Sequence, residues 1–235
     1  MIIDTENIFE TEDKARLKSP SLSQQAYEMI RRKIISLELP PGAIVDESSL
    51  QKELNLGRTP IREALLRLSL EQLVTIVPRR GIFVTEISIT DLKQLFEVRI
   101  VLESLAARLA ARRGSEEQWR LMEETLANLP PAGSANINET LIAIDERCHH
   151  IIYEAADNEF LQSTLFKLYA LSLRLWFFFL LKIGDMHEAI QQHRDILEAL
   201  KKRDAKRASD LLEHHIRAFQ EEIQAAMLGR YASEE

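Results

Sequence analysis

The fold is decided by residues 54–68, which read LNLGRTPIREALLRL. Asn55 and Gly57 are turn-forming residues that end one short helix, and Pro60 falls in the first turn of the next, where its missing N–H is not needed. In that second helix the apolar residues recur at helical spacing, at Ile61, Leu65 and Leu68. The stretch therefore predicts a helix, a turn and a second helix.

The flanking segments extend this pair of helices into a larger module. Apolar residues at helical spacing over residues 22–37 predict a preceding helix. Downstream, residues 74–77 and 82–85 favour β-structure and surround the turn at residues 78–81, which predicts a hairpin. Three helices followed by a hairpin are the plan of a winged helix-turn-helix.

Charge is distributed unevenly along the chain. The 235 residues carry a formal net charge of −7, and an acidic balance taken alone argues against a nucleic-acid partner. Residues 20–85, however, hold nine basic and seven acidic side chains, whereas residues 86–235 hold 18 basic and 25 acidic ones. The acidity belongs to the C-terminal two-thirds, so DNA binding by the N-terminal module is not excluded.

Arginines gather at the two tips that a winged helix presents to DNA. Arg58 and Arg62 are four residues apart and project from one face of a helix that fits the major groove, with Thr59 beside them. The hairpin tip carries two more arginines and a glycine that lets the backbone approach closely. We predict that double-stranded DNA is bound through Arg58, Thr59, Arg62, Arg79, Arg80 and Gly81. The alternative is that these arginines are ordinary solvated surface charges.

The rest of the chain predicts only helices. Seven glycines and seven prolines are few for this length, which favours long helices over many hairpins. Helices are expected at residues 88–113, 115–129, 137–156, 159–183, 186–202 and 204–228. The fold class is therefore mainly α, with an N-terminal winged helix-turn-helix and a C-terminal antiparallel six-helix bundle.

Four side chains in the bundle have the spacing of a metal site. Asp145 and His149 are four residues apart and share one helix face. His193 and His215 lie 11 residues before and after a turn at Asp204, so an antiparallel hairpin brings them to the same height. Three histidines and a carboxylate suit Zn²⁺, Ni²⁺, Mn²⁺ or Fe²⁺, with Zn²⁺ as our first choice. The alternative is a set of ordinary hydrogen-bonded histidines.

Other histidines and the cysteine are given no ligand role. His150 and His214 point about 100° away from the ligand faces, and His187 is expected at the surface. Cys148 is predicted to fill space in the core. Because it is the only cysteine, it excludes an internal disulfide framework and a zinc site made of cysteines alone.

Two arginines in the bundle are candidates for binding an organic acid. Arg99 falls on the apolar stripe of its helix, and an arginine that faces a core needs an anion. Its partner is either Glu103, one turn on, or the carboxylate of a bound effector whose other end reaches the metal. Arg174, on the apolar helix at residues 159–183, is a weaker candidate of the same kind.

No targeting or membrane segment is visible in the sequence. The N-terminus lacks a basic region followed by an apolar one. The most apolar run, residues 171–181, contains an arginine and is too short to cross a bilayer. We expect a cytoplasmic protein without membrane contact.

Two sets of motifs resemble a known family. Residues 54–68 and the wing segment 73–84 resemble the DNA-reading domain of GntR-type bacterial transcription regulators. The motifs at residues 145–158, 192–199 and 214–216 resemble the FCD effector domain of the FadR-like branch, in its six-helix, VanR-like form. The resemblance implies that Asp145 and the three histidines ligate a metal and that effectors are carboxylic acids.

This sequence departs from the family pattern at a few positions. Ser48 stands where related regulators often have a basic residue that contacts DNA, and Gln72 stands where a glycine often ends the recognition helix. These departures concern individual contacts and helix ends, so the family resemblance is unaffected.

The sequence thus predicts four regions and one function. The regions are a flexible arm (1–19), a DNA-binding domain (20–86), a metal- and effector-binding helical domain (87–230) and a tail (231–235). We expect a homodimeric repressor that binds a palindromic operator and is released by a small organic acid. Two alternatives remain, a metal-dependent enzyme acting on a small carboxylate and a helical domain whose metal is only structural. The absence of a convincing nucleophile or general base beside the ligands argues against the enzyme.

Overall fold

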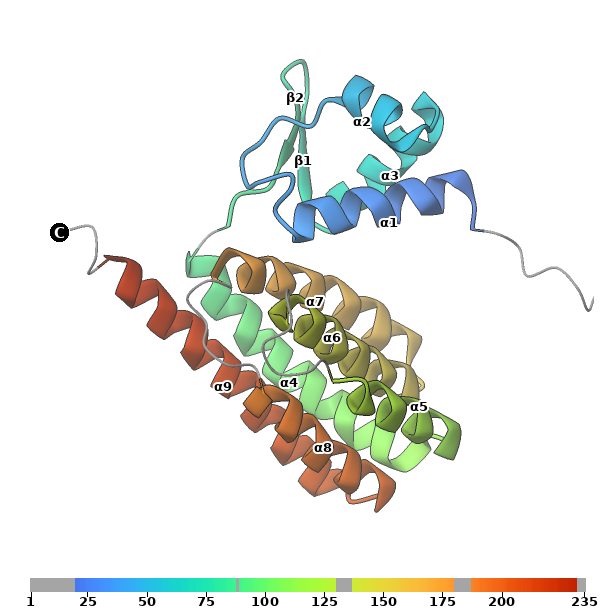
Figure 1. Cartoon of the computed structure of the whole chain (residues 1–235), viewed down its shortest axis with the longest axis vertical. Coiled ribbons are helices and arrows are strands. Elements are labelled where there is room, and N and C mark those ends of the chain that lie inside the picture. Colours follow the sequence, from blue (N-terminus) through green and yellow to red (C-terminus); the bar gives the residue numbers. More distant parts are fainter. Residues whose placement is uncertain (1–19, 88, 130–136, 180–186, 232–235) are drawn as a thin grey trace, which may run out of the picture.

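The N-terminal part of the protein is a winged helix-turn-helix, as expected (Figure 1). The computed structural model describes residues 20–87, 89–129, 137–179 and 187–231, so the predicted arm at 1–19 lies outside the described residues, as does all of the tail beyond Tyr231. The winged module, from α1 to β2, consists of α1 (Leu22–Ile35), α2 (Glu47–Leu54), α3 (Arg58–Leu70), β1 (Val74–Val77) and β2 (Gly81–Val84).

Local interactions set the ends of these helices. The Ser21 hydroxyl accepts a hydrogen bond from the Gln24 N–H at the start of α1, and the Asp46 carboxylate accepts one from Ser48 at the start of α2. Asn55 adopts a left-handed conformation (φ 52°) that ends α2 and opens the turn into α3. The buried face of α3, with Ile61, Ala64, Leu65 and Leu68, packs on α1.

The wing is a two-stranded antiparallel hairpin. Val74 pairs with Val84 and Val77 with Gly81, so the second strand begins one residue earlier than the sequence predicts. Gly81 has a φ of +119°, which favours glycine over any residue with a Cβ atom. The tip between the strands therefore carries Arg79 and Arg80 on a tight turn.

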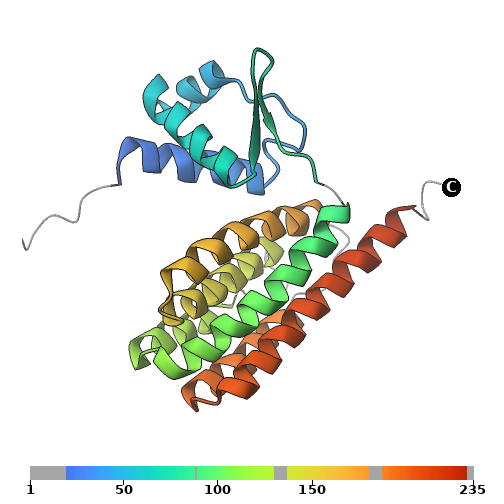
Figure 2. The ribbon, with the colours of Figure 1, turned by 180° about the vertical axis from the view of Figure 1, so that it is seen from behind.

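The C-terminal part is a bundle of helices, the helical domain (α4 to α9). Its elements are α4 (Ile89–Arg113), α5 (Glu116–Ala127), α6 (Ile137–Ala155), α7 (Glu159–Phe179), α8 (His187–Lys201) and α9 (Ala205–Tyr231). Helices α4 and α9 lie side by side along much of their length (Figure 2). The predicted breaks near residues 130–134 and 184–185 lie outside the described residues. Among the described helices, none is long and apolar enough to span a bilayer.

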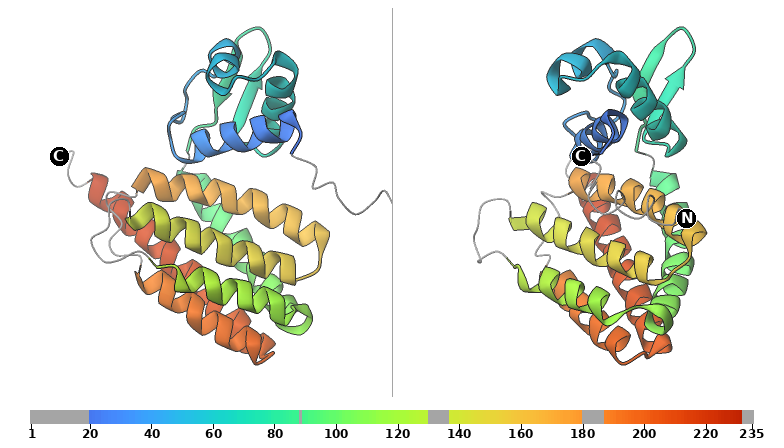
Figure 3. Two further views of the ribbon diagram at one scale, coloured as in Figure 1. Left: turned by 45° about the vertical axis from the view of Figure 1, so that its right-hand side comes forward. Right: turned by 90° about the vertical axis from the view of Figure 1, so that its right-hand side faces the viewer.

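Helix α7 lies on the side of the bundle that faces the winged module, where it contacts α1 (Figure 3). Leu171 of α7 packs against the apolar core of that module. Arg174 donates from Nη2 to the Thr85 carbonyl just after β2, and Arg31 of α1 lies 3.7 Å from Glu146 of α6. These contacts join the two parts of the chain, and α7 supplies two of the three.

Candidate nucleic-acid interface and metal centre

The predicted DNA-binding residues all lie on the exposed surface of the winged module. Three occupy the first turns of α3 and three the tip of the wing: Arg58, Thr59, Arg62, Arg79, Arg80 and Gly81. The start of α3 and the wing tip are the two sites from which a winged helix reaches a groove and the adjacent backbone. The arrangement fits DNA and leaves these six residues as candidate contacts.

Arg62 has a partner that the sequence did not reveal. Its Nε donates to Glu47 Oε2 at 2.7 Å, and its side chain remains 54% exposed. Glu47 lies in the first turn of α2, next to exposed Ser48. An acidic side chain of the preceding helix therefore holds Arg62 at the start of α3.

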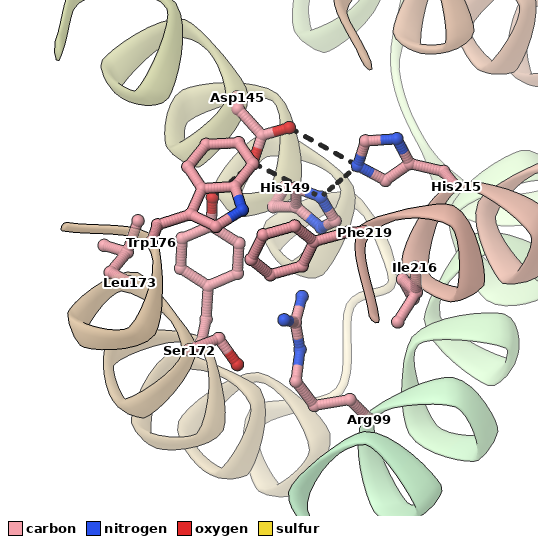
Figure 4. A pocket seen from close by; sticks show the side chains of 10 residues that line it. Arg99, Asp145, His149, Ser172, Leu173, Trp176, His215, Ile216 and Phe219 are labelled. Carbon is pink, nitrogen blue, oxygen red and sulfur yellow. Dashed lines mark hydrogen bonds and ion pairs between the residues drawn. The ribbon is translucent and has the colours of Figure 1, made fainter. Parts of the chain in front are cut away.

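The candidate metal ligands are brought together from three helices. Asp145 and His149 come from α6, His193 from α8 and His215 from α9, and all four side chains are buried. Their potential ligand atoms lie within 4.8 Å of one another. Asp145 Oδ1 is 3.3 Å from His215 Nε2, and the Nε2 atoms of His149 and His215 are also 3.3 Å apart (Figure 4).

Each histidine has its Nδ1 atom near an oxygen atom outside the four-residue cluster, and Nδ1 of His193 also lies 3.6 Å from Asp145 Oδ1. His149 Nδ1 is 2.7 Å from Glu103 Oε2 and 3.2 Å from the Tyr153 hydroxyl. His193 Nδ1 is 2.9 Å from the Ala189 carbonyl, and His215 Nδ1 is 2.9 Å from Gln192 Oε1. Metal-binding histidines are held in this way, with one nitrogen engaged by an oxygen and the other free for the ion.

Burial and neighbouring charges set the protonation states of three of the four candidate ligands, His193, His215 and Asp145. Burial lowers the pKa of His193 to about 3 and also lowers the pKa of His215, so both rings are neutral at pH 7. Burial alone would raise the pKa of Asp145, but the neighbouring histidines hold it below its usual range. The Tyr169 hydroxyl also donates to Asp145 Oδ2 at 2.5 Å.

The donor set fits a divalent transition metal. Asp145 Oδ1 and His193 Nε2 are buried without a hydrogen-bond partner among the described residues. Leaving such atoms unpaired costs free energy, whereas an ion between them would satisfy both. Three imidazole nitrogens and one carboxylate oxygen are ligands suited to Zn²⁺, Ni²⁺, Mn²⁺ or Fe²⁺.

Arg99 lies beside this cluster and is paired with Glu103. The two side chains are buried on α4, with Arg99 Nε 2.6 Å from Glu103 Oε1. Burial alone would raise the pKa of Glu103, but Arg99 and His149 lower it to about 2. Figure 4 shows Arg99 pointing toward His149 from α4. Of the two partners predicted for Arg99, the structure shows Glu103. Arg99 also lines the pocket beside the candidate ligands.

The pocket beside the candidate ligands is small. Its volume of about 10 Å³ holds one water or ion, and its other walls include Ser172, Trp176 and Phe219. Arg174, the second predicted effector residue, does not line this pocket. It lies on a different face of α7, where it contacts the segment after β2.

The remaining histidines and the cysteine lie where the sequence predicts. His214 and His187 are exposed, and His150 is outside the four-residue cluster. Cys148 is buried in the core of the bundle, where burial raises the pKa of its thiol. Sequence spacing does not reveal which side chains bind the candidate ligands through oxygen. These partners include Glu103, Tyr169 and Gln192.

The winged module and the attached helical bundle define a transcription regulator of the winged helix-turn-helix class. Residues 22–84 match the bacterial regulatory proteins of the gntR family, and residues 94–218 match the FCD domain. The chain therefore belongs to the GntR family and carries an FCD domain.

Named relatives and a solved structure agree with this assignment. The HTH-type transcriptional repressor RspR of Escherichia coli K12 is 27% identical over 86% of this chain and 89% of its own length. GlaR, a repressor of the same strain, is 28% identical over 88% and 98%. The E. coli McbR/YncC structure shares the fold at a TM-score of 0.77 and 23% identity, over 91% of this chain and all of its own. The relatives and domains indicate a DNA-binding regulator, not an enzyme.

Proposed function

We propose that the protein is a homodimeric repressor that binds a palindromic operator through Arg58, Thr59, Arg62, Arg79, Arg80 and Gly81. The exposure of all six residues at the two tips of the winged module supports this assignment. Relatives named as repressors, RspR and GlaR, favour repression over activation. Two winged modules related by a two-fold axis match the symmetry of a palindrome.

A divalent metal, Zn²⁺ as first choice, is held in this proposal by Asp145, His149, His193 and His215. The observation that carries it is the gathering of four buried side chains whose potential ligand atoms lie within 4.8 Å of one another, with Nε2 of His149 and His215 inside the cluster and Nδ1 of each histidine near an oxygen atom. Once bound, the ion supplies a Lewis acid that attracts a carboxylate oxygen. The chain's own part is to keep His193 and His215 neutral and to hold all three rings in place.

The effector in this proposal is a small organic acid that binds next to the metal, with Arg99 as a carboxylate anchor. A pocket of about 10 Å³ is too small for an organic acid, so binding has to displace side chains or move a helix. Tyr169, Ser172 and Trp176 of α7 line that pocket, and the same helix contacts the winged module. A shift of α7 would therefore change the placement of the DNA-reading surface.

Operator binding measured with and without metal tests the proposal. Full-length protein, stripped of metal or loaded with Zn²⁺, is titrated onto operator DNA in the presence of small carboxylic acids. We expect one acid to weaken binding about 5- to 150-fold in the loaded protein only, which corresponds to a usual coupling energy of about 1–3 kcal/mol. An equal response in the stripped protein would contradict the metal-assisted effector site.

The variant Asp145→Ala distinguishes a metal that binds the effector from a metal that only stabilises the helical domain. If the metal is only structural, Asp145→Ala lowers the thermal stability of the helical domain but leaves the response to the acid unchanged. If the metal binds the effector, Asp145→Ala abolishes the response in protein that is still folded.

A further inference from the structure

A second cavity lies between the two parts of the chain. Its volume is about 380 Å³, within the range of small-molecule sites. Gln72, Thr85 and Glu86 line it from the winged side, and Leu168, Leu171 and Arg174 line it from α7. It is therefore far larger than the pocket at the candidate metal ligands.

Helix α7 separates the two pockets. Tyr169, Ser172 and Trp176 recur at helical spacing and line the pocket at the metal ligands. Leu168, Leu171, Arg174 and Leu175 follow the adjacent face and line the cavity at the winged module. The helix thus presents one face to each pocket, and the cavity shares none of its lining residues with the pocket beside the metal ligands.

Arg174 is the one buried charged side chain among the described residues that line this cavity. It is 2% exposed, and its Nε has no hydrogen-bond partner in the part of the chain that the structure describes. Its Nη2 donates to the Thr85 carbonyl, an uncharged acceptor. Burial lowers the pKa of Arg174 to about 10, because the opposing effect of the Glu86 carboxylate is smaller than the cost of desolvation.

A buried arginine of this kind is stabilised by an anion in the same cavity. Glu86 is exposed at the rim, where solvent weakens its attraction for the guanidinium, and it repels a second negative charge. The remaining walls are largely apolar, with Leu92, Leu95 and Leu168 among them. These features favour one carboxylate joined to an apolar body over a dicarboxylate or a free phosphate.

We propose that this cavity is a second ligand site, in which Arg174 binds the carboxylate of a small monocarboxylic acid with an aliphatic body. The site is independent of the metal. The bound carboxylate accepts a hydrogen bond from Nε of Arg174, whose Nη2 holds the Thr85 carbonyl, so the ligand lies directly against the segment that joins the wing to α4.

Calorimetric titration of the metal-stripped full-length protein with hexanoate tests the site. We expect the wild-type protein to bind hexanoate saturably and Arg174→Met to bind it at least 10-fold more weakly. The wild-type protein should not bind hexanamide, which lacks the negative charge. Lys167→Met is the matched control, because it removes an exposed positive charge of the same helix that does not line this cavity, and it is expected to bind hexanoate as the wild type does.

A second variant tests the site in case Arg174→Met does not fold. Val98 is 47% exposed at the cavity wall, so Val98→Trp fills the space without removing a core contact. We expect it also to weaken hexanoate binding at least 10-fold. The proposal is overturned if the wild-type protein does not bind hexanoate, if Val98→Trp binds it normally, or if Lys167→Met weakens binding as much as Arg174→Met does.

Discussion

Arg62 gives the sharpest prediction for DNA binding because the free protein already holds it in an ion pair with Glu47. A side chain that reads a base contributes about 1–3 kcal/mol, whereas an exposed ion pair of this kind is worth about 0.2–1 kcal/mol. The difference predicts that Arg62→Ala weakens operator binding by about 1–2 kcal/mol per winged module, or about 5- to 30-fold.

Glu47→Gln changes the same contact in the opposite direction. It releases Arg62 from its 2.7 Å partner and removes a negative charge from the DNA-facing surface. We expect up to about 5-fold tighter operator binding, from the same energy of about 0.2–1 kcal/mol. In the Arg62→Ala background this gain should shrink, because no arginine is left to release.

Fluorescence anisotropy with a labelled operator fragment, at several salt concentrations, measures these effects. Arg67→Ala is the control from the same helix. Its guanidinium lies 3.6 Å from the centre of the Tyr27 ring and pairs with Glu71, so its loss should lower stability without changing operator affinity. Wild-type affinity of Arg62→Ala, or weaker binding by Glu47→Gln, would refute this reasoning.

Three further predictions concern stability, each measured by urea unfolding. Burial lowers the pKa of His193 to about 3, below the usual 6.5, and also lowers the pKa of His215, so the unfolded metal-free chain binds more protons in acid. Its free energy of unfolding should fall by at least about 1.4 kcal/mol per pH unit from pH 6.5 to 4, and a flat profile would contradict this. Gly81→Ala should cost about 1–3 kcal/mol because φ is +119°, whereas Gly57→Ala, at φ −71°, should cost less. Arg99→Met should cost about 3–5 kcal/mol, because it leaves the buried Glu103 carboxylate without its arginine. Adding Glu103→Gln should recover part of this loss, and equal losses in the single and double variants would be the contrary result.

The order of elements could be predicted because residues with strong conformational preferences mark their ends. Asn55 and Gly57 make the turn between α2 and α3, and Gly81 has the positive φ that the wing requires. His193 and His215 could be placed opposite each other because they lie equally far from the turn at Asp204 on two consecutive helices. Such a prediction needs only the spacing within each helix and the position of one turn.

Contacts between distant elements could not be predicted in the same way. The partners of Arg62 and His215, which are Glu47 and Gln192, are set by how neighbouring helices cross, and single-helix spacing does not contain that information. Arg174 shows the same limit. Its helix has pockets on two faces, and only the packing of the winged module on α7 decides which one the guanidinium lines.

Titration of metal-stripped protein with Zn²⁺ tests the metal centre most directly. We predict one ion per chain in the wild-type protein and at least 10-fold weaker binding in His215→Ala. The adjacent exposed His214 provides a matched control, since His214→Ala should bind Zn²⁺ normally. Absence of Zn²⁺ binding, or an equal loss in the two variants, would contradict a metal held by Asp145, His149, His193 and His215.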